Sequence, residues 1–184
     1  DTALRVKIDD LGAFLARHAR DGIARAPIVW GSLQVEGNPC VELDPARSYM
    51  KIMVDRGIDA TGREVRTLQY YLVPKGADAS QNRLEGKKTV RDDEGFDAWD
   101  DTTTLFFQLY EAGTPYEGVL RQPASEFFGG QLPSFRADTD DPARQVWAIM
   151  SFGRFFFGHL VDVYFPDLGR LGELAANLGR RGHA

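Results

Sequence analysis

Two polar side chains near the C-terminus have the spacing of an acid–base pair. His159 and Asp162 lie three residues apart in a stretch with helical periodicity, so they occupy neighbouring positions on the predicted helix. A small hydrolase or isomerase could use such a pair for proton transfer. No Gly-x-Ser-x-Gly motif supplies a nucleophile, and no partner for a catalytic cysteine is evident. We therefore favour a structural hydrogen bond and keep catalysis by His159 and Asp162 as an alternative.

An acidic run forms a second group with possible chemistry. Six of the ten residues 92–101 are Asp or Glu, and clustered carboxylates are ligands that Ca²⁺ prefers. The candidate ligands are Asp93, Asp97 and Asp100. Their spacing lacks the alternating ligands, central glycine and terminal glutamate of an EF-hand loop. Because charge runs are usually solvated, we interpret the run as a surface connection and expect no metal.

Aromatic residues interleaved with polar ones form the third group. Neighbouring residues of a strand face opposite sides, so each adjacent aromatic pair supplies one ring to each face of a sheet. A sheet with aromatic rings on both faces is covered on both or encloses a ligand on one. Core packing is the simpler interpretation, and a pocket for an apolar ligand is the functional one. The candidate ligand-binding residues are Tyr70, Tyr71, Phe106, Phe107, Gln108 and Phe156.

Composition excludes several classes of protein. The 184 residues are 43% hydrophobic and 27% charged, which is typical of one globular domain. A net charge of −5 argues against a general nucleic-acid binder. No apolar run approaches the length of about 20 residues that a membrane-spanning helix needs. The single cysteine, Cys40, excludes an internal disulfide framework and favours the cytoplasm.

Phosphate-binding motifs are also missing. Neither Gly-x-x-x-x-Gly-Lys-Ser/Thr nor Gly-x-Gly-x-x-Gly after a strand occurs, so we expect no nucleotide cofactor and, more generally, no cofactor.

The pattern along the chain predicts an α+β fold in a single domain over residues 1–184. Residues 1–136 read mainly as antiparallel strands with a short early helix, and residues 141–181 read as helical. Asp9 and Asp10 can cap the early helix, which should end at about His18. We predict a curved antiparallel sheet or barrel of about six to eight strands, against which a long C-terminal aromatic helix packs. The strands are expected at residues 3–8, 27–35, 48–54, 65–73, 84–91, 102–110 and 117–121.

The aromatic helix should begin at Asp141, whose carboxylate can cap it, with proline at the first helical position. Its apolar residues exceed a single stripe, which suggests that two faces are covered. Trp147, Phe152 and Phe155 are expected on the second face, where a homodimer or partner contact would bury them. A shorter leucine-rich helix is predicted at residues 168–178. The residues that we assign to the sheet-facing side are Val146, Ile149, Met150, Phe156 and Leu160.

Residues 87–105 resemble a segment of large bacterial oxidoreductases of the glucose–methanol–choline type, which are related to cholesterol oxidase. Residues 6–10, 30–31, 152–156 and 162–164 agree with the same proteins in order. The resemblance implies a free-standing version of their accessory β-rich region, in a context of sterol or other lipid metabolism. The flavin-binding glycine motif and the matching catalytic residues are missing, so oxidase activity is not implied.

These observations favour a non-catalytic domain that binds an apolar small molecule, lipid or sterol-like, or an oxidoreductase partner. One alternative is a small hydrolase or isomerase that uses the same cavity through His159 and Asp162. Another is a structural interaction module that docks through the aromatic helix.

Overall fold

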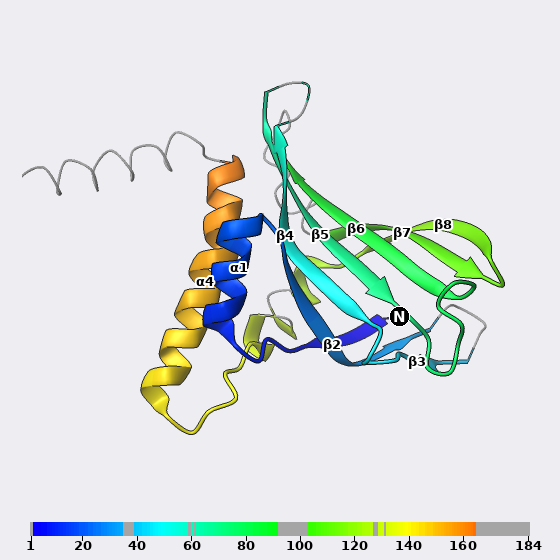
Figure 1. Ribbon diagram of the computed structural model, residues 1–184, viewed down its shortest axis with the longest axis horizontal. Helices are drawn as coiled ribbons and strands as arrows, with labels where there is room; N and C mark the ends of the chain where they lie inside the picture. Colours follow the sequence, from blue (N-terminus) through cyan, green and yellow to red (C-terminus); the bar gives the residue numbers. More distant parts are fainter. Residues whose placement is uncertain are drawn as a thin grey trace, which may run out of the picture.

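The computed structural model describes residues 2–34, 39–58, 60, 62–91, 103–126, 129–130 and 132–164 of the chain. This part is α+β, with one antiparallel sheet and two longer helices beside it (Figure 1). The strands are β1 (Thr2–Val6), β2 (Ala24–Leu33), β3 (Val41–Glu42), β4 (Tyr49–Ile58), β5 (Glu64–Leu72), β6 (Arg83–Arg91), β7 (Thr104–Glu111) and β8 (Thr114–Arg121). The helices are α1 (Leu11–Asp21), α3 (Ala124–Glu126), the 3₁₀ turn η2 (Leu132–Ser134) and α4 (Pro142–Tyr164).

The eight strands follow the order β1-β2-β4-β5-β6-β7-β8, and β3 pairs with β2. Strands that are consecutive in the sequence from β4 to β8 are neighbours in the sheet, which is the usual arrangement of sequential strands. The turn between β7 and β8 consists of Ala112 and Gly113, both with positive φ, which is the backbone that a two-residue hairpin turn favours. Within the described residues the sheet is open, so the antiparallel-sheet form of the prediction is confirmed and the closed barrel is not formed.

Irregular pairing bends the sheet. The register shifts between Arg5 and Val6 on β1 and twice on β4, and such bulges bend a strand and increase its twist. Met53 lies at the first β4 irregularity with a φ of 50°, and its side chain is fully buried. Its carbonyl accepts a hydrogen bond of 2.6 Å from Nε2 of the buried His18, which ties α1 to this bend.

The core lies on the face of the sheet that α1 and α4 cover. Phe14 of α1 and Phe155 of α4 meet with ring centroids 5.7 Å apart. A second cluster joins β2 to β5 and β6 through Ile28, Leu72 and Leu84. The opposite face of β4–β8 carries no described helix, and this asymmetry leaves one surface of the sheet open (Figure 1).

Two predicted helix starts are confirmed by their caps. Asp10 Oδ1 accepts a hydrogen bond of 2.8 Å from the Ala13 amide, and Asp141 Oδ1 accepts one of 2.9 Å from the Ala143 amide. Each carboxylate satisfies a backbone donor that the first helical turn leaves open.

The predicted sheet-facing side of α4 is wrong at three of its five positions. Val146, Ile149 and Met150 are exposed. Phe152 and Phe155, which were expected on the second face, instead pack against the core together with Phe156 and Leu160. The start of α4 extends past α1 (Figure 1), and the residues that pack against the core begin at Phe152. Helical periodicity identifies the apolar positions but not how far the covered surface extends along the axis.

Two predictions concern segments outside the described residues: the acidic run at 92–101 and the leucine-rich helix at 168–178. No helix in the described ranges combines the length and the hydropathy needed to span a bilayer.

Candidate functional site

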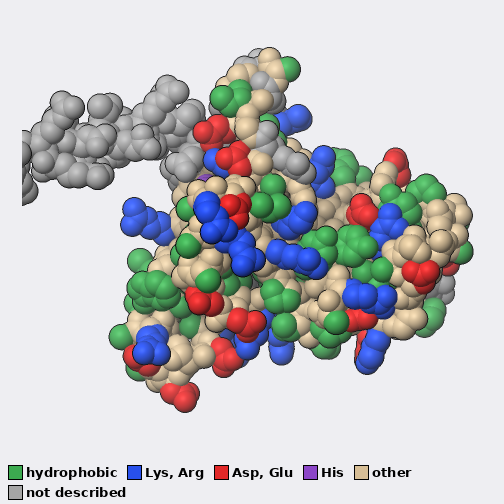
Figure 2. All heavy atoms as spheres, viewed as in Figure 1, with side chains coloured by type: hydrophobic (Ala, Val, Ile, Leu, Met, Phe, Trp, Pro, Cys, Tyr) green, Lys and Arg blue, Asp and Glu red, His purple; other side chains and the backbone are tan. Residues whose placement is uncertain are grey.

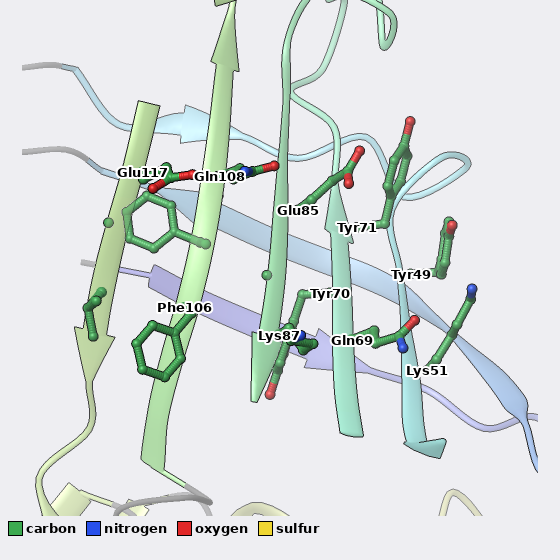
Figure 3. A pocket seen from close by; sticks show the side chains of 14 residues that line it. Tyr49, Lys51, Gln69, Tyr70, Tyr71, Glu85, Lys87, Phe106, Gln108 and Glu117 are labelled. Carbon is green, nitrogen blue, oxygen red and sulfur yellow. Dashed lines mark hydrogen bonds between the residues drawn. The ribbon is translucent and has the colours of Figure 1, made fainter. Parts of the chain in front are cut away.

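A cavity of about 830 Å³ lies on the open face of β4–β8; we call it the sheet cavity (Figure 3). The antiparallel register arranges its walls in rows that cross the strands. One row, the carboxylate row, consists of Tyr49, Tyr71, Glu85, Gln108 and Glu117. The next row on this face, the lysine row, consists of Lys51, Gln69, Lys87, Phe106 and Val119.

Hydrogen bonds from neighbouring side chains hold the polar residues of the carboxylate row in place. Arg83 Nε donates to Glu85 Oε1 at 2.6 Å, and this hydrogen bond raises the pKa of the Arg83 guanidinium. Gln108 Nε2 donates to Glu117 Oε1 at 3.1 Å, and the Tyr110 hydroxyl donates to Gln108 Oε1 at 3.0 Å. Both carboxylates of the cavity therefore already have a donor from the protein.

Aromatic rings stand at both ends of the site. Tyr49 and Tyr71 stack across β4 and β5 with centroids 5.1 Å apart, and the Arg25 guanidinium lies 3.4 Å above the Tyr49 ring. Phe106 stands on β7 with 57% of its surface exposed. An exposed ring of this size within a cavity offers apolar surface to a ligand.

The lysine row differs from the carboxylate row in its ion pairing. Lys51 and Lys87 flank Gln69, and neither takes part in an ion pair within the described ranges. The Lys51 ammonium lies 5.9 Å from the Tyr49 ring, and Gln69 Nε2 donates to Thr67 Oγ1 at 3.1 Å. In Figure 3 these side chains project from the sheet on the same side as Phe106.

Between the two rows, the floor consists of residues that turn toward the core: Tyr70, Gly86, Phe107 and Gly118. Burial raises the pKa of the Tyr70 hydroxyl, because the charged phenolate would lose its hydration there. A Cβ atom on Gly118 would overlap the Phe107 ring, and one on Gly86 would lie 2.9 Å from Leu105 Cδ1. Glycine at both positions lets large side chains of β7 lie across the neighbouring strands.

Five of the six predicted ligand-binding residues line this cavity. Tyr71, Phe106 and Gln108 are on its open face, while Tyr70 and Phe107 contribute from the floor and pack into the core. Each adjacent aromatic pair therefore places one ring on each face of the sheet, as strand alternation predicts. The sixth, Phe156, lies on α4 beside a second cavity.

The second cavity, of about 910 Å³, lies between α4 and the sheet; we call it the helix cavity. At its edge the Lys7 ammonium pairs with Asp9 at 3.3 Å and with Asp138 at 3.5 Å. Its walls are largely apolar and come from segments far apart in the sequence. They include Val6, Ile8, Leu11, Met50, Ile52, Pro133, Phe135, Trp147, Ile149, Phe152, Phe156 and Phe157.

His159, one of the two catalytic candidates, lies outside both cavities. Its ring lies 4.9 Å from Phe155 and 5.0 Å from His18 by centroid, between α4 and α1. The side chain of Asp162 is outside the described residues, so the acid–base pair stays a prediction.

The metal candidates Asp93, Asp97 and Asp100 also fall outside the described residues. Within the ranges that the structure does describe, no cluster of three or more His, Cys, Asp or Glu side chains could hold a metal ion.

Sequence reasoning missed the charged members of the sheet cavity. Lys51, Glu85 and Lys87 alternate with core residues on two strands that were predicted, so the polar face of those strands could have been identified. What the sequence does not give is the pairing of these strands, which brings the three side chains to one cavity.

The chain was compared with protein-family models, curated proteins and solved structures. No family model matches it, and no curated protein or solved structure matches it. The resemblance to the oxidoreductase accessory region therefore stays a prediction.

Proposed function

We propose that this chain is a non-catalytic domain that binds a small apolar molecule, lipid or sterol-like, in the sheet cavity. The observation that carries the proposal is the Phe106 ring, 57% exposed on the wall of a cavity whose far side holds the stacked Tyr49 and Tyr71 rings. Covering a large apolar side chain is worth about 1.5–3 kcal/mol when burial is complete. A flat or extended apolar ligand would gain part of this free energy.

The size and the rigidity of the cavity support this function. Its volume of about 830 Å³ falls within the usual range for small-molecule sites. Its walls stand on neighbouring, hydrogen-bonded strands, so little ordering is needed when a ligand binds. Among the described residues that line the cavity there is no His, Ser or Cys, and both carboxylates accept a hydrogen bond, which favours binding over catalysis.

A fluorescence titration with dehydroergosterol and with cis-parinaric acid tests the proposal. We expect at least one probe to bind the wild type, and Phe106→Ala to weaken its binding about 10-fold, because apolar contact area is lost. The matched control is Tyr116→Ala, which removes a ring of 53% exposure on β8 that lines neither cavity. Binding that Phe106→Ala leaves unchanged, or no binding at all, would contradict the proposal.

We also propose that α4 associates with a second copy of the chain. Its N-terminal half exposes Val146, Trp147, Ile149 and Met150, and residues 146–153 carry no charge. An uncharged apolar patch can meet its own copy across a two-fold axis without like-charge repulsion.

Sedimentation velocity at micromolar concentration tests self-association, with Trp147→Glu as the disrupting variant. A dimeric wild type that becomes monomeric in the variant is expected. A monomeric wild type would contradict it and would leave the oxidoreductase partner implied by the resemblance to occupy the patch. We also propose a cytoplasmic location. This proposal rests on the single cysteine and the charge content of the sequence.

A further inference from the structure

We infer that the ligand of the sheet cavity carries an anionic group, a carboxylate or a sulfate, which Lys51 and Lys87 bind from either side of Gln69. This inference rests on the proposed function and specifies which class of apolar molecule the cavity takes. It is carried by the distribution of charge within the cavity.

The cavity contains both signs of charge, but within the described ranges only the carboxylates form hydrogen bonds with other side chains. Glu85 and Glu117 accept hydrogen bonds from Arg83 and Gln108. Within the described ranges Lys51 and Lys87 have no ion-pair partner. A wholly apolar ligand would remove water from these ammonium groups without replacing it, which costs free energy. An anionic group would replace that water with charge-assisted hydrogen bonds.

The register sets the distance between the two lysines. Lys51 pairs with Gln69, and Gln69 pairs with Lys87, so the lysines stand two strand spacings apart, about 10 Å between Cα atoms. Their long side chains can converge on one anion above Gln69. The Gln69 amide uses one N–H for Thr67 Oγ1, which leaves a second N–H for the same anion.

The row that holds these lysines changes character across the sheet. On β2, Arg25 pairs with Lys51, so three cationic side chains stand over β2, β4 and β6. Over β7 and β8 the row continues with Phe106 and Val119, which are apolar. In Figure 2 basic side chains lie interspersed with hydrophobic ones over the middle of the molecule.

This change predicts the orientation of the ligand. The anionic group lies at the β4–β6 end, and the apolar body extends over Phe106 and Val119 toward β8. The carboxylates of Glu85 and Glu117 occupy the other row and disfavour an anion there, which restricts the head group to the lysine row.

The experiment compares three ligands that share one apolar body: cholesterol, cholesteryl sulfate and cholesteryl hemisuccinate, each delivered from methyl-β-cyclodextrin. For the wild type we expect both anionic ligands to bind about 10- to 100-fold more tightly than cholesterol. The double variant Lys51→Gln/Lys87→Gln should lose this preference, because both ammonium groups are removed. Circular dichroism checks the fold of the variant, in which only side chains at the open face change.

Lys75→Gln is the matched control, because it removes an exposed lysine that pairs with Glu42 at 3.0 Å outside the cavity. Equal affinities for all three ligands in the wild type would overturn the inference and leave the proposed function standing. A preference that survives in the double variant would also overturn it, because the anion would then be held elsewhere. If none of the ligands binds, the proposed function fails as well.

Discussion

The two cavities of this molecule are built in different ways. The walls of the sheet cavity come from five strands that follow one another in the sequence and pair in that order. Those of the helix cavity come from β1, the start of α1, β4, residues 133–139 and α4. Strand register places the first set of side chains, whereas packing between separate elements places the second.

This difference also separates the chemistry of the two sites. The sheet cavity combines rings with lysines and carboxylates at register positions, and the helix cavity is mainly apolar with an ion pair at its edge. A hydrogen-bonded ladder can hold charged groups at fixed spacing, while packed helices mainly provide apolar surface. We therefore expect the sheet cavity to discriminate ligands by charge and the helix cavity to depend on the stability of α4.

The largest expected effect tests how α4 is held in place. Phe155 contacts Phe14, His18 and His159, whereas Trp147 is 56% exposed on the same helix. Phe155→Ala should lower the free energy of unfolding by up to about 3 kcal/mol, because a core contact is removed. In urea denaturation of the monomer, Trp147→Ala should change the free energy of unfolding by only about 0.5 kcal/mol. Equal losses in both variants would contradict this account of α4.

A glycine pair distinguishes the walls of the two cavities. Gly118→Ala should destabilise the protein by about 1–3 kcal/mol, because its Cβ would overlap the Phe107 ring. Gly153→Ala on α4 should stabilise it by about 0.5–1 kcal/mol, because nothing lies within 4 Å of an added Cβ and alanine favours the helix. Thermal unfolding of both variants measures the two effects. If both variants shifted the melting temperature in the same direction, the packing described at one of the two glycines would be wrong.

Adjacent lysines of β6 provide a test based on pH. Lys87 lies on the open face, while Lys88 is buried, which lowers its pKa from the usual 10.5 to about 8. At pH values between these two pKa values, the unfolded chain binds more protons than the folded one. The free energy of unfolding should therefore rise as pH increases from about 8 to 10.5. Lys88→Met should flatten this rise, because the buried group that titrates is removed. Lys87→Met should leave the rise unchanged. Denaturation curves across this range would contradict the prediction if both variants behaved alike.

The smallest expected effect concerns the start of α1, which borders the helix cavity. Asp10→Ala should cost about 1 kcal/mol, because the Ala13 amide loses its acceptor. The neighbouring Asp9→Ala removes only an exposed ion pair with Lys7 and should cost less than about 0.5 kcal/mol. Chemical denaturation measures both, and a larger loss at Asp9 would show that the cap is not the main contribution.

Local signals in the sequence predicted much of this fold. Alternating residues identified the strands from β4 to β7 to within two residues at most ends, and Asp10 and Asp141 identified two helix starts. The two-residue strand β3 was not predicted, because two residues carry no periodic pattern. Five of the six predicted ligand-binding residues line one cavity, since adjacent aromatic positions on a strand must serve both faces.

The sequence by itself determined which segments are strands and helices, because period, capping and turn chemistry act over a few neighbouring residues. Only the tertiary structure decided that Lys51, Gln69 and Lys87 stand side by side, since strand pairing joins positions far apart in the chain. It also decided that Phe152 and Phe155 face the core while Val146 and Met150 do not. That choice depends on where α4 reaches the sheet, and helical periodicity carries no information about the surface that the helix meets.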